Sequence, residues 1–182
     1  MKTGKIQITP TPTLSRPGST FSKSIYPYIV QATQYIVDLG YFDKLLSSEE
    51  PPGSLKPKTK NKGSKSGSKR RTSGNALPPG NILIVLGSDQ DMIRLKNLFW
   101  GKQETSDVVS FHYPENKDPA IEILINVDQA KRRKPDDWNL EKETVFLYIH
   151  GILHCLGWDD KTKHQRQVML NLGEKILNHV WP

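Results

Sequence analysis

The stretch His150-Gly-Ile-Leu-His-Cys-Leu-Gly-Trp-Asp-Asp160 carries the most informative pattern in this chain of 182 residues. His150 and His154 are four residues apart, so on a helix their imidazoles lie on one face and can reach the same metal ion. Gly157 can then adopt the left-handed conformation that ends a helix and turns the chain back. Beyond this turn, Asp159 or Asp160 can supply a third ligand. Three protein ligands leave one position of a tetrahedral zinc open for water, as in hydrolytic sites.

A pair of histidines at this spacing is weak evidence by itself, because such pairs also line core edges and solvent-facing helix surfaces. The glycine and the carboxylates that follow make a metal site the stronger interpretation. His164 is another candidate for the third ligand. Zinc peptidases place a glutamate directly after the first histidine as general base. Gly151 occupies that position here, which argues against a peptidase.

The sequence around the motif alternates between helical and strand periodicity, which predicts a single α+β domain with a small mixed sheet packed against helices. A helix is expected from Pro27, in its first turn, to Gly40. Ser88 is expected to cap a helix and Asn139 to open the motif helix. The remaining expected elements are strands at 81–86, 107–113 and 120–126 and a last helix at about 161–180. Cys155 points about 100° around the helix from His154 and is expected in the core.

The composition is that of a globular chain with a separate basic segment. Apolar residues make up 35% and the formal net charge is +7, but eight basic and no acidic residues fall between Pro51 and Gly80. We therefore predict three parts: an N-terminal strand and helix of the domain at 1–46, a disordered basic insertion at 47–79, and the metal-binding part at 80–182. The insertion is expected to be a solvated loop, the alternative being a basic arm that attracts RNA phosphates.

One cysteine excludes a disulfide framework, and the longest aliphatic run, Ile82 to Leu86, is too short for a membrane span. The N-terminus has no apolar segment typical of a secretory signal. We therefore expect a soluble, cytoplasmic protein with no membrane partner.

The motif resembles the His-Gly-x-Leu-His-x-x-Gly-Tyr-Asp-His signature of the YbeY family of endoribonucleases and ribosomal RNA maturation factors. The similarity extends upstream, where 97–102 and 106–111 resemble the family's Asn-x-x-Tyr-Arg and Thr-Asp-Val-Leu-Ser-Phe-Pro elements. This resemblance implies a zinc-dependent endoribonuclease specific for single strands, with one Zn2+ ion. It also implies a role in maturation of small-subunit (16S) ribosomal RNA and in ribosome quality control, with the ribosomal RNA or small ribosomal subunit as partner.

By the same resemblance the metal ligands are His150, His154 and Asp160, the last standing where the family has its third histidine. The spacing of the signature ranks Asp160 above His164. Water at the open metal position or the ribose 2′-hydroxyl is the attacking group, and no catalytic side chain is identified from spacing.

Trp100 stands where the family has an arginine, and an indole cannot neutralise a phosphate. Lys102, two residues on, is a substitute for that contact. Asp160 and Trp100 are thus two departures from the family pattern. They motivate an alternative function: a catalytically weakened, ribosome-associated rRNA-processing factor that keeps the fold and the metal.

Overall fold

In the part of the chain that the structure describes, four strands form one mixed sheet in the order β1-β2-β4-β3. The computed structural model describes residues 4–14, 18–42, 80–113, 118 and 120–182. Strands β1 (Ile6–Pro10), β2 (Ile82–Gly87) and β4 (Ile121–Asn126) run parallel, and β3 (Val108–His112) pairs antiparallel with β4 at one edge. The expected α+β class is confirmed. The predicted insertion at 47–79 lies outside the described residues.

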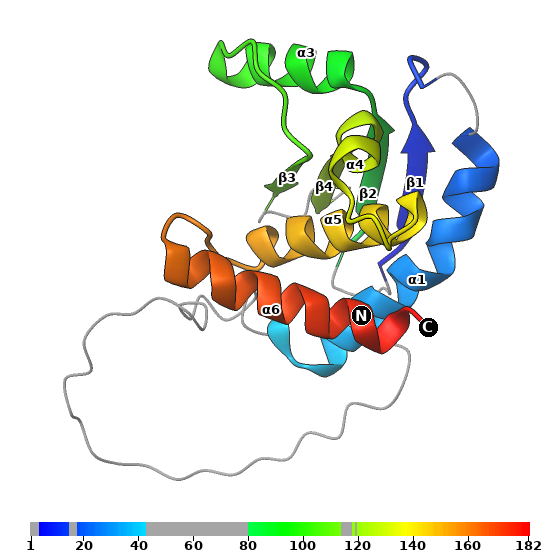
Figure 1. Cartoon of the computed structure of the whole chain (residues 1–182), viewed down its shortest axis with the longest axis vertical. Helices are drawn as coiled ribbons and strands as arrows, with labels where there is room; N and C mark the ends of the chain where they lie inside the picture. Colours follow the sequence, from blue (N-terminus) through cyan, green and yellow to red (C-terminus); the bar gives the residue numbers. More distant parts are fainter. Residues whose placement is uncertain (1–3, 15–17, 43–79, 114–117, 119) are drawn as a thin grey trace, which may run out of the picture.

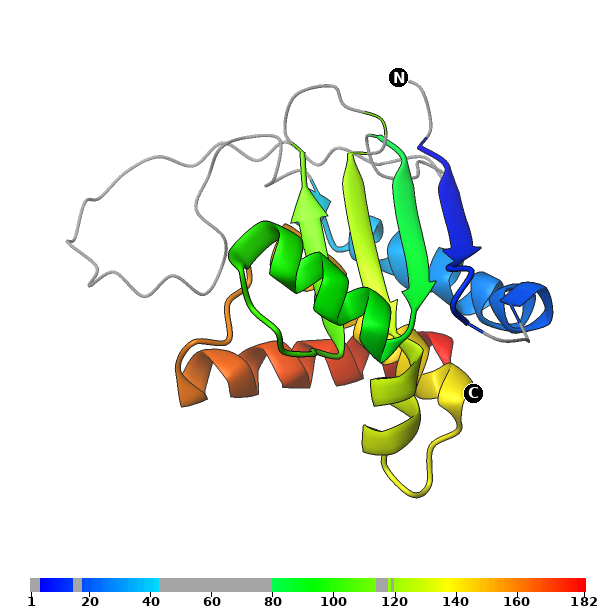
Figure 2. The same cartoon turned by 90° about the horizontal axis from the view of Figure 1, so that it is seen from above.

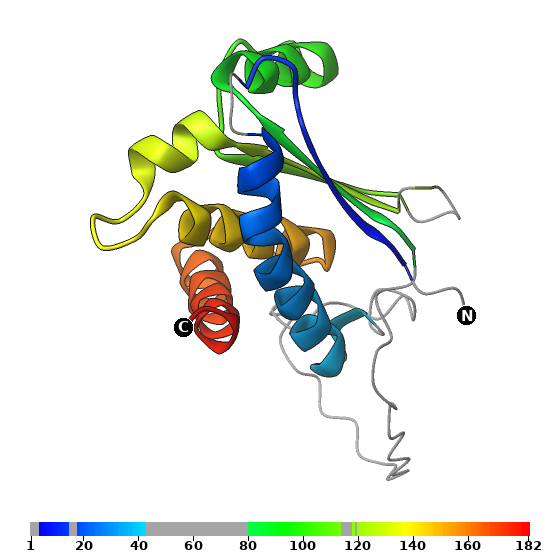
Figure 3. The ribbon, with the colours of Figure 1, turned by 90° about the vertical axis from the view of Figure 1, so that its right-hand side faces the viewer.

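Helices cover the two faces of this sheet unequally (Figures 1–3). Helices α1 (Gly18–Asp38), α5 (Leu140–Cys155) and α6 (Lys163–Val180) lie on one side, whereas α3 (Asp89–Trp100) lies on the other, as Figure 3 shows. The short α4 (Val127–Arg133) connects β4 to the segment that leads into α5. No helix in the described part of the chain is long and apolar enough to cross a bilayer.

The alternation of side chains along the central strands decides which face holds the core. In β4, Ile121, Ile123 and Ile125 are buried against the helices, whereas Glu122 and Leu124 on the opposite face stay half-buried. Helix α5 lies between the sheet, α1 and α6, so most of its residues are buried. The two histidines of the His150–Asp160 motif are therefore carried by the central helix of the core.

Two elements differ from the sequence-based expectation. Helix α1 begins at Gly18 and contains Pro27 in its interior, so the prediction of a start at Pro27 was wrong. Phe21 and Ile25 continue the buried apolar stripe of Ile29 and Ile36 upstream of the proline, and this packing offsets the roughly 3 kcal/mol that an internal proline costs.

Helix α4 was not anticipated either. Local sequence features at both ends stabilise this helix. The Asn126 side chain accepts hydrogen bonds from the N–H groups of Asp128 and Gln129, and basic residues occupy the last turn. The Ser88 cap of α3 agrees with the prediction, because Ser88 and Asp91 form a reciprocal capping box.

Candidate metal centre

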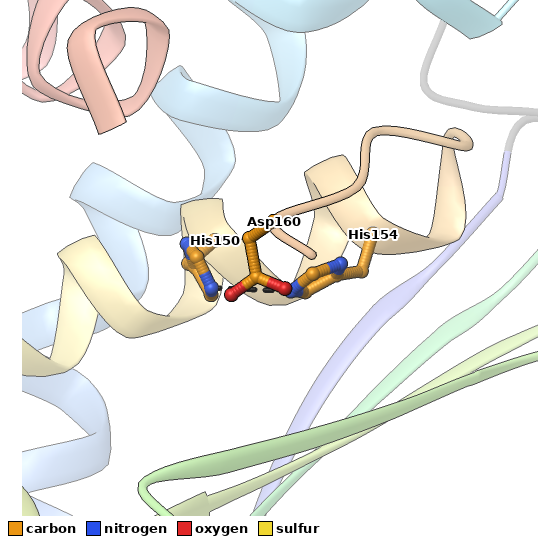
Figure 4. A group of neighbouring side chains, drawn as sticks. All are labelled: His150, His154 and Asp160. Carbon is orange, nitrogen blue, oxygen red and sulfur yellow. Dashed lines mark hydrogen bonds between the residues drawn. The ribbon is translucent and has the colours of Figure 1, made fainter. Parts of the chain in front are cut away.

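The structure brings His150, His154 and Asp160 together at the end of α5 (Figure 4). One ligand atom from each side chain lies within 4.8 Å of the others, and all three side chains are half-buried. The Nε2 atoms of the two histidines are 3.1 Å apart. Two nitrogen ligands bound to a tetrahedral zinc at ~2.0–2.1 Å are about 3.3 Å apart, so the imidazoles already have the spacing that such an ion requires. The exposed His164 does not belong to this group.

The turn after α5 carries Asp160 back over the histidines. Gly157 has a φ of 87°, which only glycine adopts easily, and its N–H donates to the His154 carbonyl at 3.0 Å. The N–H of Trp158 then donates to the Leu153 carbonyl, also at 3.0 Å. These bonds satisfy carbonyl groups at the helix end and reverse the chain. In Figure 4 the Asp160 carboxylate consequently points toward both imidazoles.

A hydrogen bond fixes the ring of His154. Its Nδ1–H donates to the carbonyl oxygen of Trp158 at 3.1 Å, which leaves the Nε2 lone pair directed at the metal position. A backbone carbonyl on the second ring nitrogen is a common orienting partner of metal-binding histidines.

The electrostatics favour the metal-binding form of the other histidine. Burial and the neighbouring His154 lower the pKa of His150, outweighing the opposite influence of Asp107 and Asp160. A lowered pKa favours neutral imidazole, which is the form that binds metal.

The two adjacent aspartates have different surroundings. Asp159 accepts the N–H of Asp160 at 2.9 Å and forms an ion pair with Lys161 at 2.8 Å. Asp160 faces the histidines, and a guanidinium nitrogen of Arg166 lies 4.0 Å from its carboxylate. This difference favours Asp160 as the third ligand, as the resemblance implied.

Gly151 brings α5 close to the sheet. A Cβ atom there would lie 3.0 Å from Cγ2 of Ile123 and 3.2 Å from Cγ2 of Val108, so the position is filled from both strands. A glutamate side chain has no room at this point of the helix. The geometry therefore agrees with the sequence argument against the peptidase arrangement.

Sequence reasoning missed a buried acid on the same helix. Glu143 lies two turns before His150, and its side chain is only 8% exposed. Burial, together with the charge of Asp107, raises its pKa to about 7 against the opposing influence of Lys134. Asp107 also acts on His150, so the three groups share one region. The seven-residue spacing places Glu143 on the same helix face as His150, but its burial depends on the tertiary fold.

The remaining predicted residues lie near the site or in the core. Cys155 is buried as expected, and burial raises its pKa to about 11, which keeps the thiol neutral. Lys102 is exposed and lies 3.8 Å from Glu104. Trp100 is 49% exposed and stacks against Phe111.

Comparison with known proteins identifies the family of this chain. The family model described as endoribonuclease YbeY matches residues 62–181. A protein named endoribonuclease YbeY from Acholeplasma laidlawii is 38% identical over 97 residues, which cover 52% of this chain and 71% of the relative. Its namesake from Heliobacterium modesticaldum is 32% identical over 121 residues, 58% of this chain and 73% of that one.

Among solved structures, the solution structure of TM1509 from Thermotoga maritima is 17% identical, with a TM-score of 0.49 over 97% of this chain and 89% of that chain. The family model spans well over half of the chain, including the whole metal-binding motif. The chain therefore belongs to the endoribonuclease YbeY family.

Proposed function

We propose that this protein is a zinc-dependent endoribonuclease that cleaves single-stranded RNA, with one ion held by His150, His154 and Asp160. The observation that carries the proposal is the convergence of two nitrogen ligands and one oxygen ligand within 4.8 Å. Three protein ligands leave a position for water or substrate, which is typical of hydrolytic zinc sites. Membership of a family of endoribonucleases supports RNA as the substrate.

The metal ion and the residues around it would contribute differently to catalysis at such a site. A bound zinc ion supplies Lewis-acid polarisation of water and of a phosphate oxygen. His154 is held in place by the Trp158 carbonyl, and Asp160 adds a negative charge that reduces the net charge of the centre. The Glu143 carboxyl group lies on the same helix face two turns before His150, and its pKa of about 7 lets it exchange a proton near neutral pH. The exposed Lys102, which lies 3.8 Å from Glu104, is the candidate for a phosphate contact.

The family also supports a role in ribosomal RNA processing. We propose that the substrate is small-subunit ribosomal RNA, which the protein meets in the cytoplasm in association with the small ribosomal subunit. The acidic and basic residues outside the segment Pro51 to Gly80 nearly balance, so the electrostatic attraction of the remainder depends on local groups rather than on net charge.

A cleavage assay tests the proposal directly. The full chain is incubated with an end-labelled single-stranded RNA and with the same RNA in a duplex, after treatment with chelator and after zinc is restored. We expect zinc-dependent cleavage of the single strand only, lost in His154→Ala and kept in the control His164→Ala, which alters a histidine outside the ligand group. Cleavage that persists in His154→Ala at the wild-type rate would show that this site is not the nuclease centre.

The alternative is a catalytically weakened processing factor that keeps the fold and the metal. Two features favour it: Trp100 brings no charge to the place where the family has an arginine, and Asp160 replaces a histidine. The double variant Trp100→Arg with Asp160→His separates the two functions. A gain in cleavage rate over a wild type that binds zinc but cuts slowly would support the weakened factor. No gain in a protein that already cleaves would count against it.

A further inference from the structure

Four aromatic side chains gather where the end of α3 meets β3. They are Phe99, Trp100, Phe111 and Tyr113, and we call them the aromatic surface. The rings of Trp100 and Phe111 are nearly parallel, with centroids 6.0 Å apart and an interplanar angle of 5°. Tyr113 continues the row at 6.4 Å and 16° from Phe111, and Phe99 lies 5.2 Å from Phe111. The rings thus form a contiguous group rather than isolated side chains.

This surface lies on the face of the sheet opposite to the core helices. Gly151 of α5 packs on Val108, so the alternation along β3 directs Phe111 and Tyr113 to the other side. Of the described helices only α3 covers that side, as Figure 3 shows. Phe99 and Trp100 are 55% and 49% exposed. Large aromatic groups left open to water in this way mark interaction sites.

The charges around the rings favour a polyanion over an apolar protein segment. Arg94 lines a hollow together with Phe111, and Lys96 and Lys102 lie on α3 and in the loop after it. Lys96 and Lys102 both pair with Glu104, at 2.9 and 3.8 Å, and a second acidic group beside the rings, Glu122, accepts a hydrogen bond from the Tyr113 hydroxyl at 3.1 Å. Three cations thus stand against these two carboxylates. Cations interleaved with exposed aromatic rings are the combination with which proteins hold single-stranded nucleic acid, the rings stacking on bases and the cations following the phosphates.

The aromatic surface and the metal centre lie on opposite faces of the same strand, β3. Within the described sheet β3 is an edge strand. One of its faces contacts α5 beside His150 through Val108, and Ser110 hydrogen-bonds Cys155, the neighbour of His154. Phe111 is three residues from Val108, about 10 Å along a strand at ~3.3 Å per residue. A short single strand passing around this edge can contact both sites.

We propose that the aromatic surface stacks on unpaired bases of single-stranded RNA and so positions the strand beside the metal centre. The inference rests on the proposed function, since it assigns a base-binding site to that substrate. It also gives Trp100 a role of its own: in place of a charge contact, the indole supplies a face for stacking.

The test measures binding of a single-stranded oligonucleotide to the zinc-loaded full chain by fluorescence anisotropy. The oligonucleotide is labelled and carries 2′-O-methyl groups, and electrophoresis verifies that it stays intact. A second oligomer has the same backbone but no bases. We expect Trp100→Ala to weaken binding of the first oligomer about 5- to 150-fold, the range measured for losing one aromatic stacking partner. Binding of the oligomer without bases should be weak and unchanged by the substitution.

Two matched variants separate stacking from other effects. Leu98→Ala removes a neighbouring apolar side chain that is 80% exposed but has no ring, and it should change the affinity less than twofold. Trp100→Phe keeps a ring and should retain most of the affinity. Thermal unfolding of each variant verifies the fold.

Three results would overturn the inference: unchanged affinity in Trp100→Ala, an equal loss in Leu98→Ala, or an equal loss with the oligomer lacking bases. Unchanged RNA affinity would point to a protein partner for the rings instead. The cleavage assay tells this failure from that of the proposed function. A wild type that cuts single-stranded RNA while Trp100→Ala binds normally refutes only the stacking, whereas a wild type that neither binds nor cuts refutes both.

Discussion

His154 and Trp158 are joined by a hydrogen bond from the imidazole Nδ1–H to the backbone carbonyl, 3.1 Å long. The bond connects a metal-facing side chain to the turn that follows its own helix. The turn therefore does two things at once, since it returns Asp160 to the histidines and fixes the ring of one of them. Both depend on Gly157, whose φ of 87° allows the reversal.

Gly157→Ala should consequently damage the site and the fold together. An alanine at positive φ costs roughly 1–2 kcal/mol, and a shifted Trp158 carbonyl would release His154. We expect a lower unfolding temperature and zinc affinity reduced about 10- to 100-fold, the usual effect of losing an orienting partner. Gly101→Ala is the matched control, because Gly101 also has positive φ, at 65°, with open space around it and no part in the metal centre. It should lose similar stability and keep its zinc affinity; equal affinities in both variants would contradict the role of the turn.

Zinc content after purification should identify the third ligand. We expect one equivalent in the wild type, almost none in His154→Ala, and a large loss in Asp160→Ala, because two ligands hold zinc much more weakly than three. His164→Ala should bind like the wild type, since that side chain lies outside the ligand group. Plasma emission spectroscopy on dialysed samples gives the stoichiometry. Full zinc content in Asp160→Ala would mean that another group completes the site.

Gly151→Ala should destabilise the protein although alanine is the better helix former. The new Cβ would lie 3.0 and 3.2 Å from methyl groups of Ile123 and Val108, and both belong to the buried face of the sheet. Overpacking of this kind typically costs 1–3 kcal/mol, which denaturant unfolding can resolve. Gly173→Ala is the control: its nearest atom is the ring edge of Phe146 at 3.1 Å, and this half-buried side chain can move aside. Equal free energies of unfolding in the two variants would argue against tight packing under the histidines.

Helix α5, which carries the candidate metal ligands His150 and His154, could be predicted because the sequence features that define it are local. The spacing of His150 and His154, the Asn139 cap and the glycine after the helix each depend on a few neighbouring residues, and the structure reproduces all three. The capping box of α3 is of the same kind. Neighbouring residues alone determine such features, so they can be predicted without knowledge of the tertiary fold.

The features that were missed depend on tertiary contacts. Pro27 reads locally as a helix start, but packing of Phe21 and Ile25 into the core extends α1 beyond it. Glu143 reads as an ordinary acid in the first turn of α5, and only the fold shows that it is buried near Asp107. The row of rings at Trp100 and Phe111 brings together residues from a helix and a strand, a proximity that no local pattern indicates.

The buried position of Glu143 predicts a measurable pH dependence of stability. Its pKa is about 7 in the folded protein against an ordinary value of 4.5, so the folded state binds this proton more tightly than the unfolded state. The free energy of unfolding should therefore fall as the pH rises from about 4.5 to about 7, by an amount on the order of 3 kcal/mol, and this contribution should be flat above that range.

Glu143→Gln removes the titrating group while keeping the size of the side chain. We expect a flatter stability profile between pH 5 and pH 7.5 and a variant more stable than the wild type at pH 8, measured by urea unfolding of metal-free protein. Glu141→Gln, on the same turn with a more exposed side chain, should keep the wild-type profile. Asp107→Asn should move the fall in stability to lower pH, because the charge of Asp107 contributes to the raised pKa of Glu143. If Glu143→Gln and the wild type have parallel profiles, Glu143 ionises as an ordinary surface acid, and its proposed part in moving a proton is wrong.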